Sequence, residues 1–199
     1  MGKAEETRKS IIEKSAVVFN KNGFQRTSMS TLTDALGITK GAIYGHFTDK
    51  DDLAVEAFRS SVERIRRRIG ERIDDHKGAL GKLRAYAESF VVFFEETRNE
   101  GGCPILNTAA DSDDTHPQLL DEVRRALIEW EERIVSLVDL GKSTGEFRLG
   151  AGACVFAANF IALIEGGILL AKTLNDRKYL ERSVGAINLL IDAMLVAIP

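Results

Sequence analysis

The stretch "LTDALGITKGAIYGHFTDKDDL", residues 32–53, carries the most informative motif of this chain. The stretch contains a short helix-like segment with glycines at Gly41 and Gly45 and with polar side chains beside them at Tyr44 and His46. A glycine in a helix interior weakens the helix by about 1 kcal/mol relative to alanine. A helix of such low intrinsic stability at this position therefore requires an explanation.

The residues on either side of Gly37 have the form of a helix-turn-helix. Ser28 is expected to cap a first helix that ends at Gly37, and Thr39 is expected to cap a second helix. This second helix should run to about Phe47. The link "LGITK" is short, and Gly37 suits a turn that needs a left-handed backbone conformation.

Apolar residues give these helices an inner face. The expected packing residues are Leu32, Leu36, Ile38, Ile43 and Phe47, against Ile12, Ala16 and Phe19 of a preceding helix. The outward residues are then Thr39, Lys40, Ala42, Tyr44 and His46. Their hydroxyl, ammonium, phenol and imidazole groups match DNA phosphates and base edges. Gly41 would remove a side chain where the helix backbone approaches a major groove most closely. The alternative is a surface turn with no partner.

Helical periodicity, and not the alternation of a strand, continues through the rest of the chain. A long helix is expected to begin at Asp49. Further helices are expected at residues 79–98, 105–110, 118–140, 151–174 and 178–197. Gly141 is expected to end the helix before it. The predicted fold class is all-α. A helix-turn-helix three-helix domain occupies residues 1–50, and a helical ligand-binding and dimerisation domain occupies residues 51–199.

The charge of the chain is uneven. The 199 residues carry a formal net charge of -3. Residues 1–50 hold eight Lys or Arg and five Asp or Glu, which makes this part +3 and leaves −6 on the remainder. A basic N-terminal segment on an acidic body favours a polyanionic partner for that segment.

Other functional classes lack their sequence signals. Two cysteines are too few for a disulfide framework, and three histidines have no metal-like spacing, so we expect no metal and no cofactor. No orienting group or oxyanion site accompanies a nucleophile, so we expect no catalytic residues. "DLGKST", residues 139–144, lacks the earlier glycine and the preceding strand of a phosphate-binding loop. No charged and then apolar leader opens the chain, and we expect a cytoplasmic protein.

Residues 155–170 are apolar on nearly every face of the expected helix. Asn159 and Glu165 interrupt this run, and a charge deep in a bilayer is costly, so we expect a buried helix and no membrane span. A helix that is apolar all round must be buried all round, and one chain can cover only one side. We therefore expect a homodimer through residues 151–174 and 178–197. Its recognition helices would reach successive major grooves, about 34 Å apart, on a near-palindromic double-stranded DNA operator.

Three aromatic side chains and one cysteine are the candidates for sensing a small molecule. Phe90, Trp130 and Phe160 lie at core-compatible helical positions, where they either fill the core or line a pocket. Pro104 fits the first position of a short helix, which places Cys103 at its cap. There the positive end of the helix dipole favours the reactive thiolate. The alternative for Cys103 is plain packing, with an apolar effector held elsewhere among the helices.

Residues 8–53 resemble the DNA-binding domain of the TetR family of bacterial transcription regulators. The resemblance lies in the order of a first helix, "GF", "TSM", "LGITKGAIY", "HF" and "KDDL". It implies that the recognition-helix positions are Lys40, Gly41, Ala42, Tyr44 and His46. It also implies phosphate contacts at Ser28 and Thr39 and a DNA-backbone contact at Lys50. Gly45 departs from the family, which usually has an aromatic or bulky residue there.

A second resemblance concerns "GGCPILNTAADSDDTHPQL", residues 101–119. It is similar to a segment in one branch of the family, which includes regulators of reactive-electrophile responses. This likeness implies Lys172 as a candidate neighbour of Cys103. The resulting prediction is a ligand-responsive, DNA-binding transcription repressor that a small-molecule effector releases from its operator. The alternative is a helical protein-interaction module that has lost DNA binding.

Overall fold

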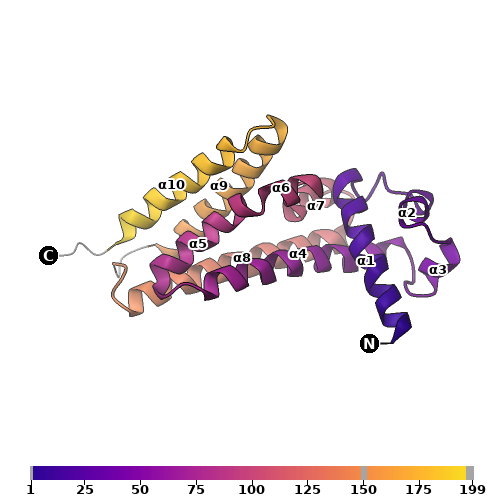
Figure 1. The fold of residues 1–199 in the computed structure, drawn as a ribbon, viewed down its shortest axis with the longest axis horizontal. Helices are drawn as coiled ribbons and strands as arrows, with labels where there is room; N and C mark the ends of the chain where they lie inside the picture. Colours follow the sequence, from indigo (N-terminus) through magenta and orange to yellow (C-terminus); the bar gives the residue numbers. More distant parts are fainter. Residues whose placement is uncertain (1, 149–151, 196–199) are drawn as a thin grey trace. The chain divides into compact units, whose positions relative to one another are not determined.

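The computed structural model describes residues 2–148 and 152–195, and these form an all-helical protein (Figure 1). The helices of the described residues are α1 Lys3–Asn22, α2 Met29–Leu36, α3 Lys40–Tyr44, α4 Lys50–Asp74, α5 Gly78–Val92, α6 Phe94–Asn99, α7 Pro104–Ser112, α8 Pro117–Ser143, α9 Ala153–Thr173 and α10 Lys178–Met194. The predicted all-α class and the N-terminal helix-turn-helix are confirmed. Of the two predicted dimer segments, Ala151 and residues 196–197 lie outside the described residues.

Contacts within the chain divide it into two compact units. Unit 1 contains the chain up to Ile65 together with Asn99–Ala126. Unit 2 contains Arg66–Arg98 and the chain from Leu127 onward. In unit 1, α1, α2 and α3 lie next to one another, and in unit 2, α9 and α10 lie side by side (Figure 1). The predicted functional domains, 1–50 and 51–199, remain a prediction.

A single apolar cluster holds the helix-turn-helix together. Its buried members are Ile11, Ile12, Leu32, Leu36, Ile43, Phe47 and Leu53, with Val18, Phe19, Met29 and Ile38 packed around them. Each predicted inner-face residue of α2 and α3 belongs to this cluster. Ile43 and Leu32 are fully buried, so the inner sides of both short helices have fixed neighbours.

The predicted caps and turn of this motif are confirmed. Ser28 Oγ accepts a hydrogen bond from Thr31 N at 3.1 Å, and Thr39 Oγ1 accepts one from Ala42 N at 3.2 Å. Gly37 ends α2 with φ 68° and ψ 32°, in the left-handed region where a Cβ would be strained. These side chains satisfy backbone donors that a short helix leaves without partners.

The end of α3 differs from the prediction. The helix ends at Tyr44 and not near Phe47, and Gly45 is its C-cap. His46 N donates to Ile43 O three residues back, which tightens the last turn. The chain then turns into α4, where Asp49 Oδ1 accepts from Asp52 N at 2.8 Å. His46 therefore lies in the turn after the helix.

The predicted helix 79–98 is two helices in the structure. The break falls at Phe93, whose φ of −91° and ψ of 5° leave the helical conformation. The guanidinium of Arg68 lies 4.0 Å from the centroid of the Phe93 ring, and the next residue, Phe94, is buried. No proline or glycine stands at the break, so no local residue in the sequence predicts it.

Gly141 lies inside α8 and does not end it, contrary to the prediction. A Cβ built on Gly141 would lie 2.0 Å from Phe147 Cδ2 and 2.9 Å from the Cβ of Ala79. Phe147 is itself buried, and its N–H donates to Gly141 O at 3.0 Å. Gly141 therefore leaves room for an aromatic ring, and residues 139–143 of "DLGKST" form the end of α8.

We expect Gly141→Ala to lower the free energy of unfolding by about 1–3 kcal/mol, because the added methyl overpacks a closed site. Urea denaturation followed by circular dichroism measures this. Gly70→Ala, in α4, is the matched control, since a Cβ there meets nothing within 4 Å. The control should raise the free energy of unfolding by about 0.5–1 kcal/mol. Equal stability of wild type and Gly141→Ala would contradict the close packing at Phe147.

Candidate nucleic-acid interface

The outer face of α3 is an exposed surface on a fixed support. Lys40, Gly41, Ala42 and Tyr44 are exposed, while Ile43 between them is fully buried. Tyr44 is 50% exposed although its ring is large and apolar. Its phenol and the ammonium of Lys40 form no hydrogen bond or ion pair with any other described residue. Exposed donors that have no partner in the described part of the chain are suited to base edges and phosphates.

The glycines of this face are not required by the chain itself. A Cβ on Gly41 would have only Thr39 Oγ1 near it, at 3.8 Å, and a Cβ on Gly45 would meet Gly41 O at 3.4 Å. Both distances are ordinary contacts, and neither glycine has a positive φ. Nothing within unit 1 therefore excludes a side chain at either position.

The other predicted contact residues are placed less uniformly. Ser28 and Thr39 are exposed at the starts of α2 and α3, although their side-chain oxygens are engaged as caps. His46 is half-buried in the turn beyond α3, with its ring 6.4 Å from that of Phe47. The recognition face is thus shorter than the sequence predicted. The DNA contacts of Ser28, Thr39 and His46 remain predictions.

Lys50 is half-buried, and its ammonium is bonded to backbone carbonyls of an earlier loop. Its Nζ donates to Phe24 O at 3.0 Å and to Thr27 O at 3.1 Å, and it lies 4.0 Å from the centroid of the Phe24 ring. The resemblance implied a contact with the DNA backbone at this lysine. Sequence reasoning missed these inner partners, because they lie 23 and 26 positions earlier in the chain.

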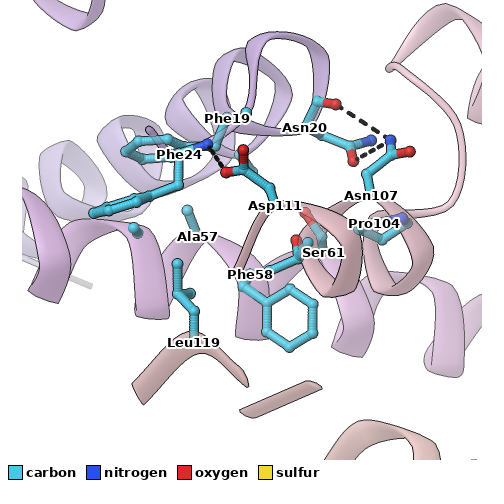
Figure 2. A pocket seen from close by; sticks show the side chains of 14 residues that line it. Phe19, Asn20, Phe24, Ala57, Phe58, Ser61, Pro104, Asn107, Asp111 and Leu119 are labelled. Atoms are coloured by element: carbon cyan, nitrogen blue, oxygen red, sulfur yellow. Dashed lines mark hydrogen bonds between the residues drawn. The ribbon is translucent and has the colours of Figure 1, made fainter. Parts of the chain in front are cut away.

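A polar junction ties α1 to α7 inside unit 1 (Figure 2). Asn107 Nδ2 donates to Asn20 O and Oδ1, and Asn20 Nδ2 donates to Gly102 O at 2.9 Å. Asp111 Oδ2 accepts from Phe24 N at 2.6 Å. Beside these bonds, residues of α1, α4 and α7 line a cavity of about 30 Å³, which is space for about one water molecule.

The glycine pair before α7 has a steric reason at this junction. Gly101 and Gly102 have φ of 110° and 101°, and a Cβ on Gly101 would lie 2.9 Å from Asn20 O. Cys103 is the N-cap of α7 and Pro104 its first residue, as predicted. Cys103 is only 5% exposed, and reactive cysteines are usually accessible. Burial therefore favours the packing alternative over a reactive sensor.

A series of ion pairs links α1, α4 and α8 within unit 1. Arg8 of α1 pairs with Glu56 of α4, Glu56 with Arg59, and Arg59 with Glu122 of α8 at 2.6 Å. Arg125 also pairs with Glu122 at 3.0 Å. The hydrogen bonds from Arg59 hold the pKa of Glu122 below its ordinary value, against the opposing effect of burial. Glu122 is therefore an ionised carboxylate that holds two arginines.

The predicted ligand residues Phe90, Trp130 and Phe160 meet in unit 2. Phe90 stacks on Trp130 with centroids 5.5 Å apart, and Tyr86 joins Phe90 to Phe160 through contacts of 6.1 and 5.5 Å. Sequence reasoning missed Tyr86, whose pKa burial raises. Trp130 Nε1 is buried without a hydrogen bond among the described residues. The structure thus builds one aromatic cluster from three helices, with a polar atom available inside it.

Two remaining sequence predictions concern Lys172 and metal binding. Lys172 is exposed on α9 in unit 2, whereas Cys103 belongs to unit 1, so their pairing stays a prediction. Within residues 2–148 and 152–195, no group of three His, Cys, Asp or Glu side chains is arranged to hold a metal ion.

Family models match both parts of the chain. Residues 11–57 match the model described as "Bacterial regulatory proteins, tetR family". Residues 79–187 match the model described as "Tetracyclin repressor-like, C-terminal domain". The second match alone covers more than half of the 199 residues.

Solved structures and characterised proteins agree with these matches. A TetR-family transcriptional regulator from Cytophaga hutchinsonii is 31% identical, with a TM-score of 0.93 over 100% of this chain and 99% of that one. A TetR transcriptional regulator from Chloroflexus aurantiacus is 36% identical, with a TM-score of 0.92 over 98% of both chains. The transcriptional repressor DhaR of Mycobacterium sp. is 23% identical over 88% of this chain and 87% of its own.

We expect Glu122→Gln to lower the free energy of unfolding at pH 7 by about 1–3 kcal/mol, as for other hydrogen bonds to charged groups. Because the folded-state pKa is lowered, the carboxylate's contribution is complete above its ordinary pKa and disappears as the pH falls through the folded-state value. The difference between wild type and variant should therefore shrink between about pH 5 and pH 3. Urea denaturation across this range measures it.

Asp121→Asn is the matched control for this prediction. Asp121 also pairs with an arginine, Arg124, on the same helix, but both side chains are more than 60% exposed. Such surface pairs contribute about 0–1 kcal/mol, so the control should change little at any pH. A difference for Glu122→Gln that persists unchanged to pH 3 would show that ionisation of Glu122 is not what stabilises unit 1.

Proposed function

The chain belongs to the TetR family of bacterial transcription regulators, and on this basis we propose that it is a homodimeric repressor whose operator binding is controlled by a small molecule. The outer face of α3 carries the proposal for DNA. This face offers free donors at Lys40 and Tyr44 on a buried support, and its two glycines have no steric reason inside the chain. The positive charge of residues 1–50 supports a polyanionic partner.

The exposed faces of α9 and α10 support the homodimer. Val155 on α9 is 68% exposed and Leu189 on α10 is 71% exposed, and Leu169, Leu170 and Leu190 are also exposed. By length and composition, α9 is apolar enough to cross a membrane, with a mean hydropathy of 2.0, yet only 39% of its most apolar window is buried within this chain. A second copy that contributes the same two helices would cover these side chains through a two-fold interface.

The aromatic cluster of unit 2 supports a small apolar or aromatic effector. Tyr86, Phe90, Trp130 and Phe160 provide ring faces, and the buried Trp130 Nε1 offers one donor without a partner among the described residues. Such a combination of apolar walls and a few polar atoms is typical of ligand sites. A ligand would release DNA by binding one conformation of the dimer better than another, and only by that difference in affinity. Helix α4 contributes residues to both units and is the proposed route of the signal.

We expect Gly41→Ala to weaken operator binding at least about tenfold while raising the free energy of unfolding by about 0.5–1 kcal/mol. The methyl fits the free protein but occupies the space into which the DNA would come. Duplexes selected by the wild-type protein from a random-sequence library serve as the operator. Fluorescence anisotropy measures binding, and urea denaturation measures stability.

Two further variants serve as a control and as a second test of the same face. Gly70→Ala brings a similar gain in helix stability in α4 and should leave operator affinity unchanged. Tyr44→Ala should weaken binding strongly without unfolding the protein, because the ring is half exposed. If the wild type selects no sequence from the library, or if Gly41→Ala and Tyr44→Ala bind as tightly as the wild type, α3 is not the DNA-binding element.

We expect Leu189→Asp to convert the dimer to a monomer at about 10 μM, because two copies of an unpaired carboxylate would be buried at the interface. Sedimentation velocity measures the state. Ile128→Asp, on α8, is the matched control, since Ile128 is also an exposed apolar residue but lies outside α9 and α10. A wild type that sediments as a monomer, or a dimer that survives Leu189→Asp, would refute the proposed interface.

A further inference from the structure

The aromatic cluster of unit 2 contains two buried polar groups that have no partner in the described part of the chain. Trp130 is 8% exposed, and its Nε1 is buried without a hydrogen bond. Tyr86 is 6% exposed, and its hydroxyl forms no hydrogen bond with another described residue. A buried polar group that is left unsatisfied costs free energy, so each of these groups calls for a partner from outside the chain.

Both groups can donate a hydrogen bond. The indole N–H of Trp130 is a donor only. Burial raises the pKa of the Tyr86 phenol, against the opposing positive charges of Arg133 and Arg66, so the phenol keeps its proton at neutral pH. The ring of Phe90 contacts both Tyr86, at 6.1 Å between centroids, and Trp130, at 5.5 Å. The two donors therefore belong to one cluster, and the group that they suit is an acceptor.

The charge beside these donors is positive. Arg133 follows Trp130 by three residues on α8, which places both on the same side of the helix. The guanidinium of Arg133 forms no hydrogen bond or ion pair with a described residue, whereas Arg66 is paired with Glu129. Both arginines lie close enough to act on the Tyr86 hydroxyl. The unbalanced charge of Arg133 favours an acceptor that is itself negatively charged.

The rings of the cluster suit a planar ligand. Phe90 and Trp130 are stacked with an interplanar angle of 28°. Phe160 is fully buried, but Phe90 is only half-buried, so the cluster reaches the surface of unit 2 at Phe90. An aromatic ring gains free energy from stacked or edge-on contacts with such side chains, beyond the burial of its area.

We propose that the aromatic cluster of unit 2 binds an aromatic anion, such as an aromatic carboxylate. The ring of the ligand packs against Phe90, and its oxygens accept from Trp130 Nε1 and from the Tyr86 hydroxyl, with Arg133 nearby. This inference rests on the proposed control by a small molecule. It narrows the effector from any small apolar or aromatic molecule to an acidic one.

The experiment uses two matched pairs of probes, benzoate with benzamide and 2-naphthoate with 2-naphthamide. Each amide has nearly the shape of its carboxylate but no charge. Calorimetry measures binding to the full-length protein without DNA. The chain has a single tryptophan, so the one indole N–H resonance of the ¹⁵N-labelled protein reports on Trp130. We expect at least one carboxylate to bind about tenfold more tightly than its amide and to move this resonance downfield, because Nε1 becomes a donor to a charged group.

Variants separate the contributions of the donors and of the charge. Trp130→Phe and Tyr86→Phe keep a ring but remove a donor, and each should weaken carboxylate binding about tenfold. Arg133→Gln should weaken it about threefold, as for an exposed charge, and should leave amide binding unchanged. Arg67→Gln is the matched control, because Arg67 is an exposed arginine of α4 that lies 3.8 Å from Glu71. This control should bind both probes as the wild type does.

Three results would overturn the inference. The first is the failure of both carboxylates to bind, and the second is amide binding as tight as carboxylate binding in both pairs. The third is a carboxylate whose affinity is unchanged in both Trp130→Phe and Tyr86→Phe. The proposed function fails by a different result, since the wild type would then select no duplex, or the bound carboxylate would leave its affinity for the selected duplex unchanged.

Discussion

The structure depends on burying the inner face of a helix too short to exist alone. Helix α3 has five residues, and isolated helices below about 12–15 residues are marginal in water. Ile43 and Phe47 provide the burial, and the cap at Thr39 satisfies one of the free donors. Because tertiary packing supplies this stability, the outer side of α3 is free of any structural task and can carry small residues.

In unit 1, side-chain bonds also fix the backbone segments around α3. Ion pairs from Arg8 to Arg125, the asparagine junction of α1 with α7, and the Lys50 site all fix backbone segments around α3 by side-chain bonds. None of these bonds uses an atom on the outer face of α3. Unit 2 differs at its surface, since α9 and α10 leave large apolar side chains exposed. We infer that unit 1 binds DNA through the outer face of α3 and that unit 2 binds a second copy of the chain through α9 and α10.

The sequence predicted those features that local residues determine. The caps at Ser28 and Thr39, the left-handed Gly37 and the cap position of Cys103 depend on neighbours within a few positions, and all are confirmed. The features that it missed are decided by distant partners. Phe93 at the break contacts Arg68, Gly141 leaves room for Phe147, and Lys50 bonds to carbonyls of an earlier loop.

We propose that the outer face of α3 meets DNA in two copies related by two-fold symmetry. A photoreactive benzoylphenylalanine in place of Tyr44, in the full-length protein on its selected duplex, tests it directly. We expect crosslinks to one position on each strand, related by two-fold symmetry and about one helical turn apart. Crosslinking from the same group at Ile128 with none from position 44 would contradict it.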